Sequence, residues 1–200
     1  HRPRDTEALL NYAQAESRIL ENRETTLSRA AVAYHQYLQV VPDDVEIQKK
    51  LLALYNRLES WADLESYAEF FLEQRPDDID FLYYRARGTD ANGKRADAIE
   101  AYEDLIARGG HPRDVYTRLA LLLYDRDRSE AEAFVARIAK EHANDPQARL
   151  AIAEFYRQTN QPERAGQELE GARRIAPDDP EVLTALARHA LETRQPEQAL

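Results

Sequence analysis

The 200-residue sequence contains no cysteine, which excludes disulfide frameworks, thiolate metal sites and cysteine nucleophiles. No stretch approaches the roughly 18 consecutive apolar residues of a membrane-spanning helix. The few glycines form neither a phosphate-binding loop nor a nucleophile elbow. The histidines are scattered, without metal-ligand spacing, so we expect neither a metal nor another cofactor. These absences together predict a chain that is not an enzyme.

Charge and composition further limit the fold class and the kinds of partner that the sequence allows. Acidic residues outnumber basic ones by 37 to 27, and the resulting net charge of −10 disfavours nucleic acid as a partner because phosphates are repelled. Charged residues make up 32% of the chain and hydrophobic residues 43%, which is typical of amphipathic helices and not of a disordered segment.

A small or apolar residue recurs about every 34 residues. The successive spacings are 34, 34, 33, 34 and 34, and the position is occupied by Ala30, Leu64, Ala98, Ala131, Ala165 and Ala199. After each such residue an apolar stripe continues at helical spacing. A repeat of this length predicts helical hairpins that stack on one another into a solenoid, a shape suited to binding.

Proline and aspartate mark the boundaries between the repeats. The segments 42–44, 76–78 and 177–179 each read Pro-Asp-Asp, in which proline ends one helix and aspartate caps the next. We therefore predict helices at about 5–22, 25–40, 44–58, 61–74, 78–91, 95–108, 112–125, 128–141, 146–158, 162–175 and 179–192, with a twelfth that begins near Glu197.

The period, the pairs Ala30-x3-Tyr34 and Ala98-x3-Tyr102, and the trailing prolines resemble the tetratricopeptide repeat family. The resemblance implies an all-α fold, a right-handed superhelical solenoid of antiparallel helix hairpins with about 11–12 helices. It covers residues 1–200 as a single solenoid, with units at about 5–44, 45–78, 79–112, 113–145 and 146–179 and a partial unit at 180–200. Since the sequence lacks an initiating Met and stops early in a helix, we expect a fragment of a longer chain.

The resemblance also implies that the first helix of each hairpin lines a concave groove. Three positions on each first helix are free to face it. The first position holds Lys49, Tyr83, Thr117, Leu150 and Thr184; the second holds Ala53, Arg87, Leu121, Glu154 and Arg188; and the third holds Arg57, Ala91, Asp125, Gln158 and Glu192.

From this stripe we predict a set of residues that contact a partner. They are Lys49, Arg57, Tyr83, Arg87, Leu121, Leu150 and Arg188. Arginine would donate forked hydrogen bonds and tyrosine a flat apolar contact, so we expect the N-terminal half to receive an extended or helical segment that bears carboxylates. The competing interpretation, which the weakness of most surface charges favours, is that these charges pair with neighbouring Glu and Asp or face solvent.

The predicted function is a non-catalytic scaffold or adaptor that binds protein or peptide partners, acidic ones among them. Two alternatives stay open: an accessory repeat segment of a larger enzyme or membrane-anchored assembly factor, and a helical-repeat RNA binder, which the net charge opposes. An uncapped terminal repeat exposes an apolar face, which predicts self-association through the terminal repeats. The sequence specifies neither the partner nor the compartment.

Overall fold

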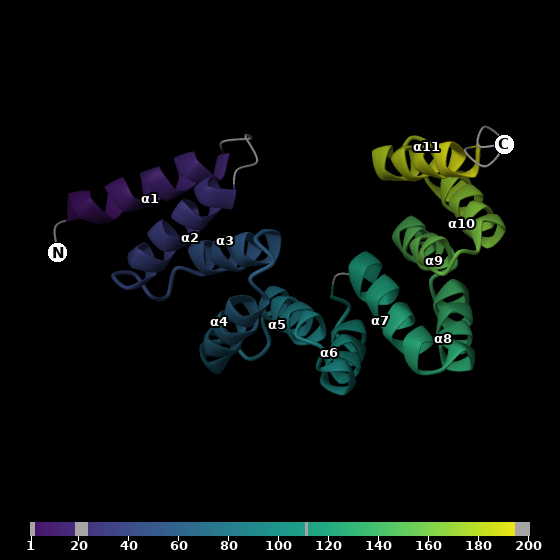
Figure 1. Cartoon of the computed structure of the whole chain (residues 1–200), viewed down its shortest axis with the longest axis horizontal. Helices are drawn as coiled ribbons and strands as arrows, with labels where there is room; N and C mark the ends of the chain where they lie inside the picture. The colour runs from purple at the N-terminus through teal and green to yellow at the C-terminus, as the bar shows by residue number, and fades with distance from the viewer. Residues whose placement is uncertain (1–2, 19–23, 111, 195–200) are drawn as a thin grey trace. The chain divides into compact units, whose positions relative to one another are not determined.

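The computed structural model describes residues 3–18, 24–110 and 112–194 (Figure 1). All regular secondary structure in these residues is helical, which confirms the predicted all-α class. The eleven helices are α1 (Pro3–Arg18), α2 (Glu24–Leu38), α3 (Val45–Arg57), α4 (Trp61–Gln74), α5 (Ile79–Ala91), α6 (Arg95–Ala107), α7 (Pro112–Arg126), α8 (Arg128–Glu141), α9 (Pro146–Gln158), α10 (Pro162–Ile175) and α11 (Pro180–Arg194). The predicted twelfth helix near Glu197 lies outside the described residues.

The chain divides into two compact units, His1–Ala101 and Tyr102–Leu200. We call these the N-terminal unit and the C-terminal unit and describe each by itself. In the N-terminal unit α1 packs on α2, and α4 packs on both α3 and α5. In the C-terminal unit α7 packs on α8 and α9, and α10 packs on α9 and α11. Each unit is thus a stack of helical hairpins.

Aspartate side chains cap the N-terminal ends of helices, as the sequence predicts. Oδ1 of Asp44 accepts a hydrogen bond from the backbone N–H of Ile47 at 3.2 Å. Oδ1 of Asp78 accepts from the N–H of Phe81 at 3.2 Å, and α9 is capped in the same way by Asp145. These carboxylates satisfy amide hydrogens that have no partner in the first helical turn, and they suit the positive end of the helix.

The position that recurs every 34 residues lies in the core. Its exposed fraction is 0% at Ala30, Leu64, Ala98 and Ala131 and 1% at Ala165. A small side chain at this point lets neighbouring helices approach closely, while large side chains one or two turns later, such as Tyr34 and Tyr102, fill the space between them. The periodicity of the sequence is therefore a periodicity of packing.

Two helices of the N-terminal unit, α4 and α5, approach each other closely. A Cβ atom on Gly88 would lie 2.8 Å from both Cβ and the backbone nitrogen of Glu65, so only glycine fits this crossing. The Glu65 side chain is buried at the same place. Its Oε1 accepts hydrogen bonds from Thr89 Oγ1 at 2.8 Å and Lys94 Nζ at 2.9 Å, and its Oε2 accepts from Asn92 Nδ2 at 2.7 Å.

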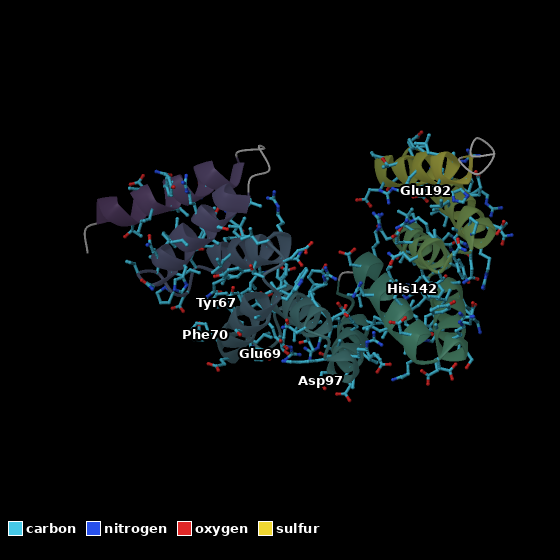
Figure 2. All side chains as sticks on the ribbon, in the orientation of Figure 1. Tyr67, Glu69, Phe70, Asp97, His142 and Glu192 are labelled. Atoms are coloured by element: carbon cyan, nitrogen blue, oxygen red, sulfur yellow. The ribbon has the colours of Figure 1, made fainter. Side chains whose placement is uncertain are left out.

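Two of the histidines take part in packing instead of standing alone at the surface. Nδ1 of His35 shares a hydrogen bond of 3.1 Å with Oη of Tyr67, a residue of α4 (Figure 2), and the Tyr67 ring stacks on that of Tyr55 at 5.3 Å. In the C-terminal unit Nε2 of His142 shares a 3.1 Å hydrogen bond with Oη of Tyr116. These hydrogen bonds give both imidazoles a structural role in the contact between neighbouring helices.

Candidate partner-binding surface

The three positions that the sequence places on one stripe differ in burial. Side chains at the first position are buried in α5, α7 and α9, with exposed fractions of 9% at Tyr83, 7% at Thr117 and 2% at Leu150. Side chains at the second position are half-exposed in α3, α5, α7 and α9 and exposed in α11. Side chains at the third position are exposed in all five of these helices. The accessible part of the stripe is therefore its second and third positions.

Contacts with neighbouring helices explain why the first position is buried in α7 and α9. Oγ1 of Thr117 on α7 donates to the backbone carbonyl of Ala151 on α9 at 3.2 Å, in a buried contact 34 residues apart in sequence. Leu150 belongs to a core cluster with Leu169 and Val182. Leu150 thus supplies packing surface and Tyr83 is buried, so we do not retain either residue as a partner contact.

Lys49 is held by the next odd-numbered helix. Its Nζ lies 2.6 Å from Oδ2 of Asp80 and 3.2 Å from Oδ2 of Asp78. The hydrogen bond with Asp80 outweighs the opposing effect of burial and raises the pKa of Lys49 above its ordinary value. Two carboxylates therefore compensate this positive charge, as the competing interpretation of the charged stripe requires.

The arginines of the N-terminal unit are placed differently from Lys49. Arg57 is exposed at the C-terminal end of α3. The guanidinium of Arg87 lies over the Trp61 ring, 5.6 Å from its centroid, and the Arg87 Nε atom is buried without a hydrogen-bond partner. Cations over indole rings are stabilised by the π-face, so this contact helps to orient the guanidinium.

In the C-terminal unit the structure brings second-position residues from two helices into one cleft. Glu154 of α9 and Arg188 of α11 line it together, above a floor that includes Leu150 and Leu169. The lining side chains nearly fill the cleft, which leaves about 20 Å³, roughly the room of one water molecule. Leu121, the second-position residue of α7, is half-exposed and does not line this cleft.

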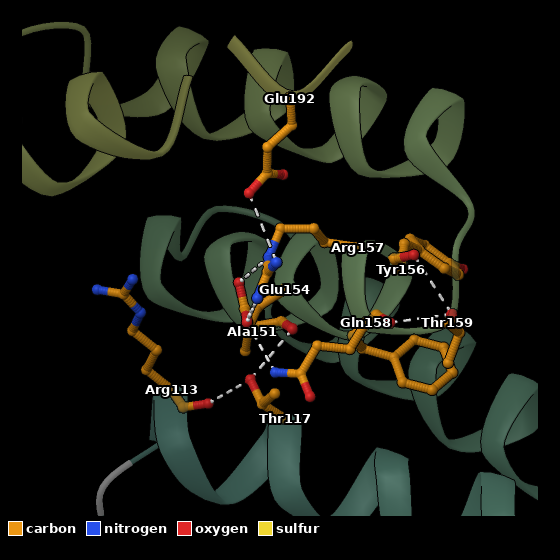
Figure 3. Close-up of polar contacts among 10 residues, drawn as sticks. Arg113, Thr117, Ala151, Glu154, Tyr156, Arg157, Gln158, Thr159 and Glu192 are labelled. Atoms are coloured by element: carbon orange, nitrogen blue, oxygen red, sulfur yellow. Dashed lines mark hydrogen bonds and ion pairs between the residues drawn. The ribbon is translucent and has the colours of Figure 1, made fainter. Parts of the chain in front are cut away.

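Glu154 is the centre of a polar cluster in the cleft (Figure 3). Arg157 donates from Nε to Oε2 of Glu154 at 2.9 Å and from Nη2 to Oε1 at 2.6 Å, and Gln158 donates to the same Oε1 at 2.7 Å. The hydrogen bonds with Arg157 outweigh burial and lower the pKa of Glu154 below its ordinary value. The Glu154 carboxylate is therefore ionised at neutral pH.

The prediction from sequence missed two further arginines of the cleft. Arg113 of α7 also lines it and donates from Nη1 to Oε2 of Glu181 at 2.7 Å. Arg157 lines it and lies 3.6 Å from Glu192 through Nη1 and Oε1. Both side chains lie about one helical turn or less from the predicted positions, and a search for every cation near the stripe would have included them.

Neither a metal-binding cluster nor a membrane-spanning helix occurs within the described ranges. No group of three or more potential metal ligands gathers there. None of the helices described is both long and apolar enough to cross a membrane.

Part of the chain matches a known repeat family, and its fold is similar to several solved structures. Residues 122–188 match the family model of the tetratricopeptide repeat. Similar solved structures include a thermophilic TPR protein of Thermus thermophilus, with a TM-score of 0.61 at 17% identity, covering 93% of this chain and 99% of that one. MamA from Desulfovibrio magneticus RS-1 is also similar, with a TM-score of 0.60 at 12% identity and coverages of 88% and 97%.

A third similar structure is YrrB, described as a TPR protein with an unusual peptide-binding site, with a TM-score of 0.53 at 17% identity and coverages of 88% and 89%. At these identities the likeness shows the fold. The search of curated proteins found no match to this chain. Repeats of this family generally act as protein-interaction scaffolds without catalytic activity.

Proposed function

We propose that this tetratricopeptide repeat protein is a non-catalytic scaffold, and that within each unit the second and third positions of the odd-numbered helices hold a segment of a partner protein. One observation carries the proposal: the second position is half-exposed in α3, α5, α7 and α9 and exposed in α11, while the first position is buried in α5, α7 and α9. A preformed helical surface binds without an ordering cost of its own, which favours recognition by a few anchor residues.

In the N-terminal unit, Arg57 and Arg87 are the anchors that we propose for carboxylates of the partner. Arg57 is exposed, and Arg87 is oriented by the ring of Trp61. A guanidinium that is already oriented loses less side-chain entropy when it binds a carboxylate through two parallel hydrogen bonds. Lys49 is not part of this proposal because Asp78 and Asp80 already pair with it.

Site-specific photo-crosslinking tests the location of the surface. A photoreactive phenylalanine analogue at Ala53, the half-exposed second position of α3, is compared with the same analogue at Ala62, which is exposed on α4. In cells that express the native full-length protein, we expect cross-links to partner proteins from position 53 and not from position 62. Cross-links from position 62 alone would place binding on another face and contradict the proposal.

Charge reversal tests the recognition of carboxylates. We expect Arg57→Glu combined with Arg87→Glu to lower partner recovery in affinity capture by about tenfold, since each reversal replaces an attraction with a repulsion. Lys50→Glu, an exposed change on the same helix as Arg57 but outside the three positions, is the matched control and should leave recovery unchanged. Unchanged recovery with the double variant would show that Arg57 and Arg87 are not anchors for the partner.

A further inference from the structure

The first hairpin of the N-terminal unit has an open apolar groove between α1 and α2. Apolar side chains dominate its lining, among them Leu9, Tyr12 and Val32, and they leave about 360 Å³ of room. Tyr12 and Val32 are 47% and 57% exposed, so nothing in the described residues covers this surface. An apolar cavity of about 150 Å³ is large enough to hold benzene, so the groove has room for a large apolar side chain of a partner.

An exposed aromatic side chain lies on the next hairpin. Phe70 of α4 is 52% exposed, and it lies beside Glu69 at the outer edge of the helix (Figure 2). The repeat itself does not require an aromatic residue at this position. Its equivalents in the other even-numbered helices are Gln36, Asp104, Arg137 and Gly171. The groove and Phe70 together account for three of the five large hydrophobic side chains that are exposed in the described ranges, and such concentrations of apolar surface mark interaction sites.

The groove and the surface around Phe70 carry opposite charges. Arg29 is the charged residue that lines the groove, and its side chain is exposed. The charged side chains exposed on α4 are all acidic, and they are Asp63, Glu69 and Glu73. Lys94 also acts on Glu69, but its Nζ is already bonded to Oε1 of the buried Glu65 at 2.9 Å. We call Phe70 together with the three exposed carboxylates of α4 the acidic ridge.

The acidic ridge is unfavourable for α4 on its own. Glu69 and Glu73 are four residues apart, a spacing at which like charges repel across one helical turn. Glu73 also lies near the C-terminal end of α4, where the helix dipole favours positive charge and the last turn has no basic residue. A positively charged group from another molecule would offset both effects. Features that weaken local structure in this way are expected where a surface serves a function.

We infer that the acidic ridge of one copy of this chain docks in the groove of a second copy. The Phe70 ring enters the apolar groove, and Arg29 pairs with carboxylates of the ridge. Phe70 does not line the groove of its own chain, so the contact requires another molecule. A second copy is the occupant because the same chain supplies both an aromatic anchor with acidic surroundings and an apolar groove with a single cation. The contact uses none of the stripe positions and is thus independent of the proposed function.

The repeat register favours a symmetric dimer. Gln36, which lines the groove, and Phe70 are 34 residues apart and occupy equivalent positions of α2 and α4. Equivalent positions of successive hairpins lie on the same side of a stack. Two copies related by a two-fold axis can therefore each present a groove to the ridge of the other, so that the contact forms twice. The sequence predicts self-association through the terminal repeats, and the groove lies in the first of them.

Sedimentation equilibrium of the full-length protein tests the anchor. We expect a dimer, and we expect Phe70→Ser to raise its dissociation constant at least about a hundredfold, because the apolar burial of a phenylalanine is lost twice. Leu191→Ser is the matched control, since Leu191 is 67% exposed on α11 and its replacement should leave the dissociation constant unchanged. Equal effects of the two serine substitutions would contradict a specific role for Phe70.

Exchanging the charges tests the pairing. One variant carries Arg29→Glu and the other carries Glu69→Lys with Glu73→Lys, all at exposed positions. Alone, each variant brings like charges together twice, so we expect its dissociation constant to rise at least about tenfold. In an equal mixture each groove again faces a ridge of opposite charge, so mixed dimers should form with nearly the affinity of the unchanged protein.

The absence of cysteine allows the contact to be located by cross-linking. Ser28→Cys labels the groove, and Ser66→Cys labels α4 one turn before Phe70. With a short bis-maleimide we expect a mixture of the two variants to give more cross-linked dimer than either variant alone. Ser129→Cys, an exposed change on α8, replaces Ser66→Cys in the control mixture, which should give no product above background.

Each outcome supports or overturns the inference. A protein that stays monomeric up to high concentration overturns it, even if Phe70 or Arg29 proves to contact a different protein. A dimer that persists in Phe70→Ser, or mixed charge variants that do not associate, would place the interface elsewhere and overturn it as well. Thermal unfolding verifies that each variant is folded, and the charge exchange still tests the inference if Phe70→Ser is not. The cross-linking at position 53 judges the proposed function separately from all of these outcomes.

Discussion

The two units join their repeats by different chemistry. In the N-terminal unit the contact between α4 and α5 contains the buried carboxylate of Glu65, with three donors from one neighbouring segment. In the C-terminal unit arginine–glutamate pairs at the surface connect helices of successive repeats, as between Arg164 of α10 and Glu132 of α8. One repeat pattern in the sequence thus supports two kinds of junction.

This difference determines how strongly substitutions destabilise each unit. A buried carboxylate is stable only while its donors are in place, so disturbing the α4–α5 contact leaves desolvated polar groups without partners. An exposed ion pair contributes little to folding, so its arginine can exchange partners at small cost. We therefore expect substitutions to destabilise the N-terminal unit more than the C-terminal unit.

The largest expected effect is that of Gly88→Ala. The new Cβ would meet Cβ and the backbone of Glu65 at 2.8–2.9 Å, so α4 and α5 must separate. We expect a loss of about 2 kcal/mol in the free energy of unfolding, after allowing for the better helix propensity of alanine. Hydrogen exchange measured by mass spectrometry should show faster exchange in α4 and α5.

Gly171→Ala in the C-terminal unit is the matched control for this change. A Cβ atom there would meet the Arg149 side chain, with Nη1 at 2.8 Å, instead of a helix backbone. Because that side chain can move, we expect less than about 1 kcal/mol of destabilisation. Equal losses from the two alanine substitutions would contradict the contrast between the junctions.

The second effect is the pH dependence of the N-terminal unit. Burial alone would raise the pKa of Glu65, but the hydrogen bonds from Lys94, Asn92 and Thr89 outweigh it and lower the pKa below its ordinary value. The ionised carboxylate therefore stabilises the folded unit at neutral pH. This stabilisation is lost as the pH falls from about 4.3 through the lower pKa of the folded state.

Thermal unfolding at several pH values tests this dependence. We expect Glu65→Gln to cost about 1.5 kcal/mol at neutral pH, where hydrogen bonds to an ionised group are lost. Below the pKa of the folded state the variant and the unchanged protein should converge. A difference that stayed constant from neutral to acidic pH would show that the charge of Glu65 does not stabilise the fold.

Thr117→Val probes the junction of α7 with α9 and should have a smaller effect. It removes the hydrogen bonds from Oγ1 to the carbonyls of Ala151 and Arg113 while it keeps the shape of the side chain. Since the Ala151 carbonyl is a backbone helix acceptor in its own right, we expect a loss of about 1 kcal/mol in urea unfolding. Thr184→Val, an exposed change at the first position of α11, is the control and should be nearly neutral.

The smallest expected effect is that of Arg164→Lys. Arg164 binds Glu132 through both terminal nitrogens, at 2.7 and 2.8 Å, and lies over the Tyr156 ring at 4.0 Å from its centroid. Lysine keeps the charge but not the fork, so we expect a loss of about 0.5 kcal/mol that shrinks as salt is added. A loss above that of Gly88→Ala would reverse the comparison of the two units.

Much of the fold was predictable because its signals are local. The predicted helices at 44–58 and 61–74 correspond to α3 at Val45–Arg57 and α4 at Trp61–Gln74. Between the predicted helices at 78–91 and 95–108, Gly93 has a φ of 81°, a conformation that glycine adopts without strain. Helix periodicity, capping and turn geometry each depend on a few adjacent residues, so a single sequence contains them.

The surface was predictable only in part. The sequence placed Glu154 and Arg188 on the stripe, but it placed Tyr83 and Leu150 there on equal terms, although both are buried. Periodicity shows which residues share a face of one helix and not how much of that face the next repeat covers. The pair of Arg113 with Glu181 spans 68 residues, and no local pattern indicates it.

Local sequence was enough to establish that helices form, where they begin and which small or apolar residue returns in each hairpin, because helix propensity, capping and spacing act over a few neighbouring residues. The accessible positions of the stripe and the pairing of each arginine with its carboxylate became apparent only once the helices were packed together. Those outcomes depend on the distance and angle between helices of successive repeats, which are set by the fit of all their side chains together.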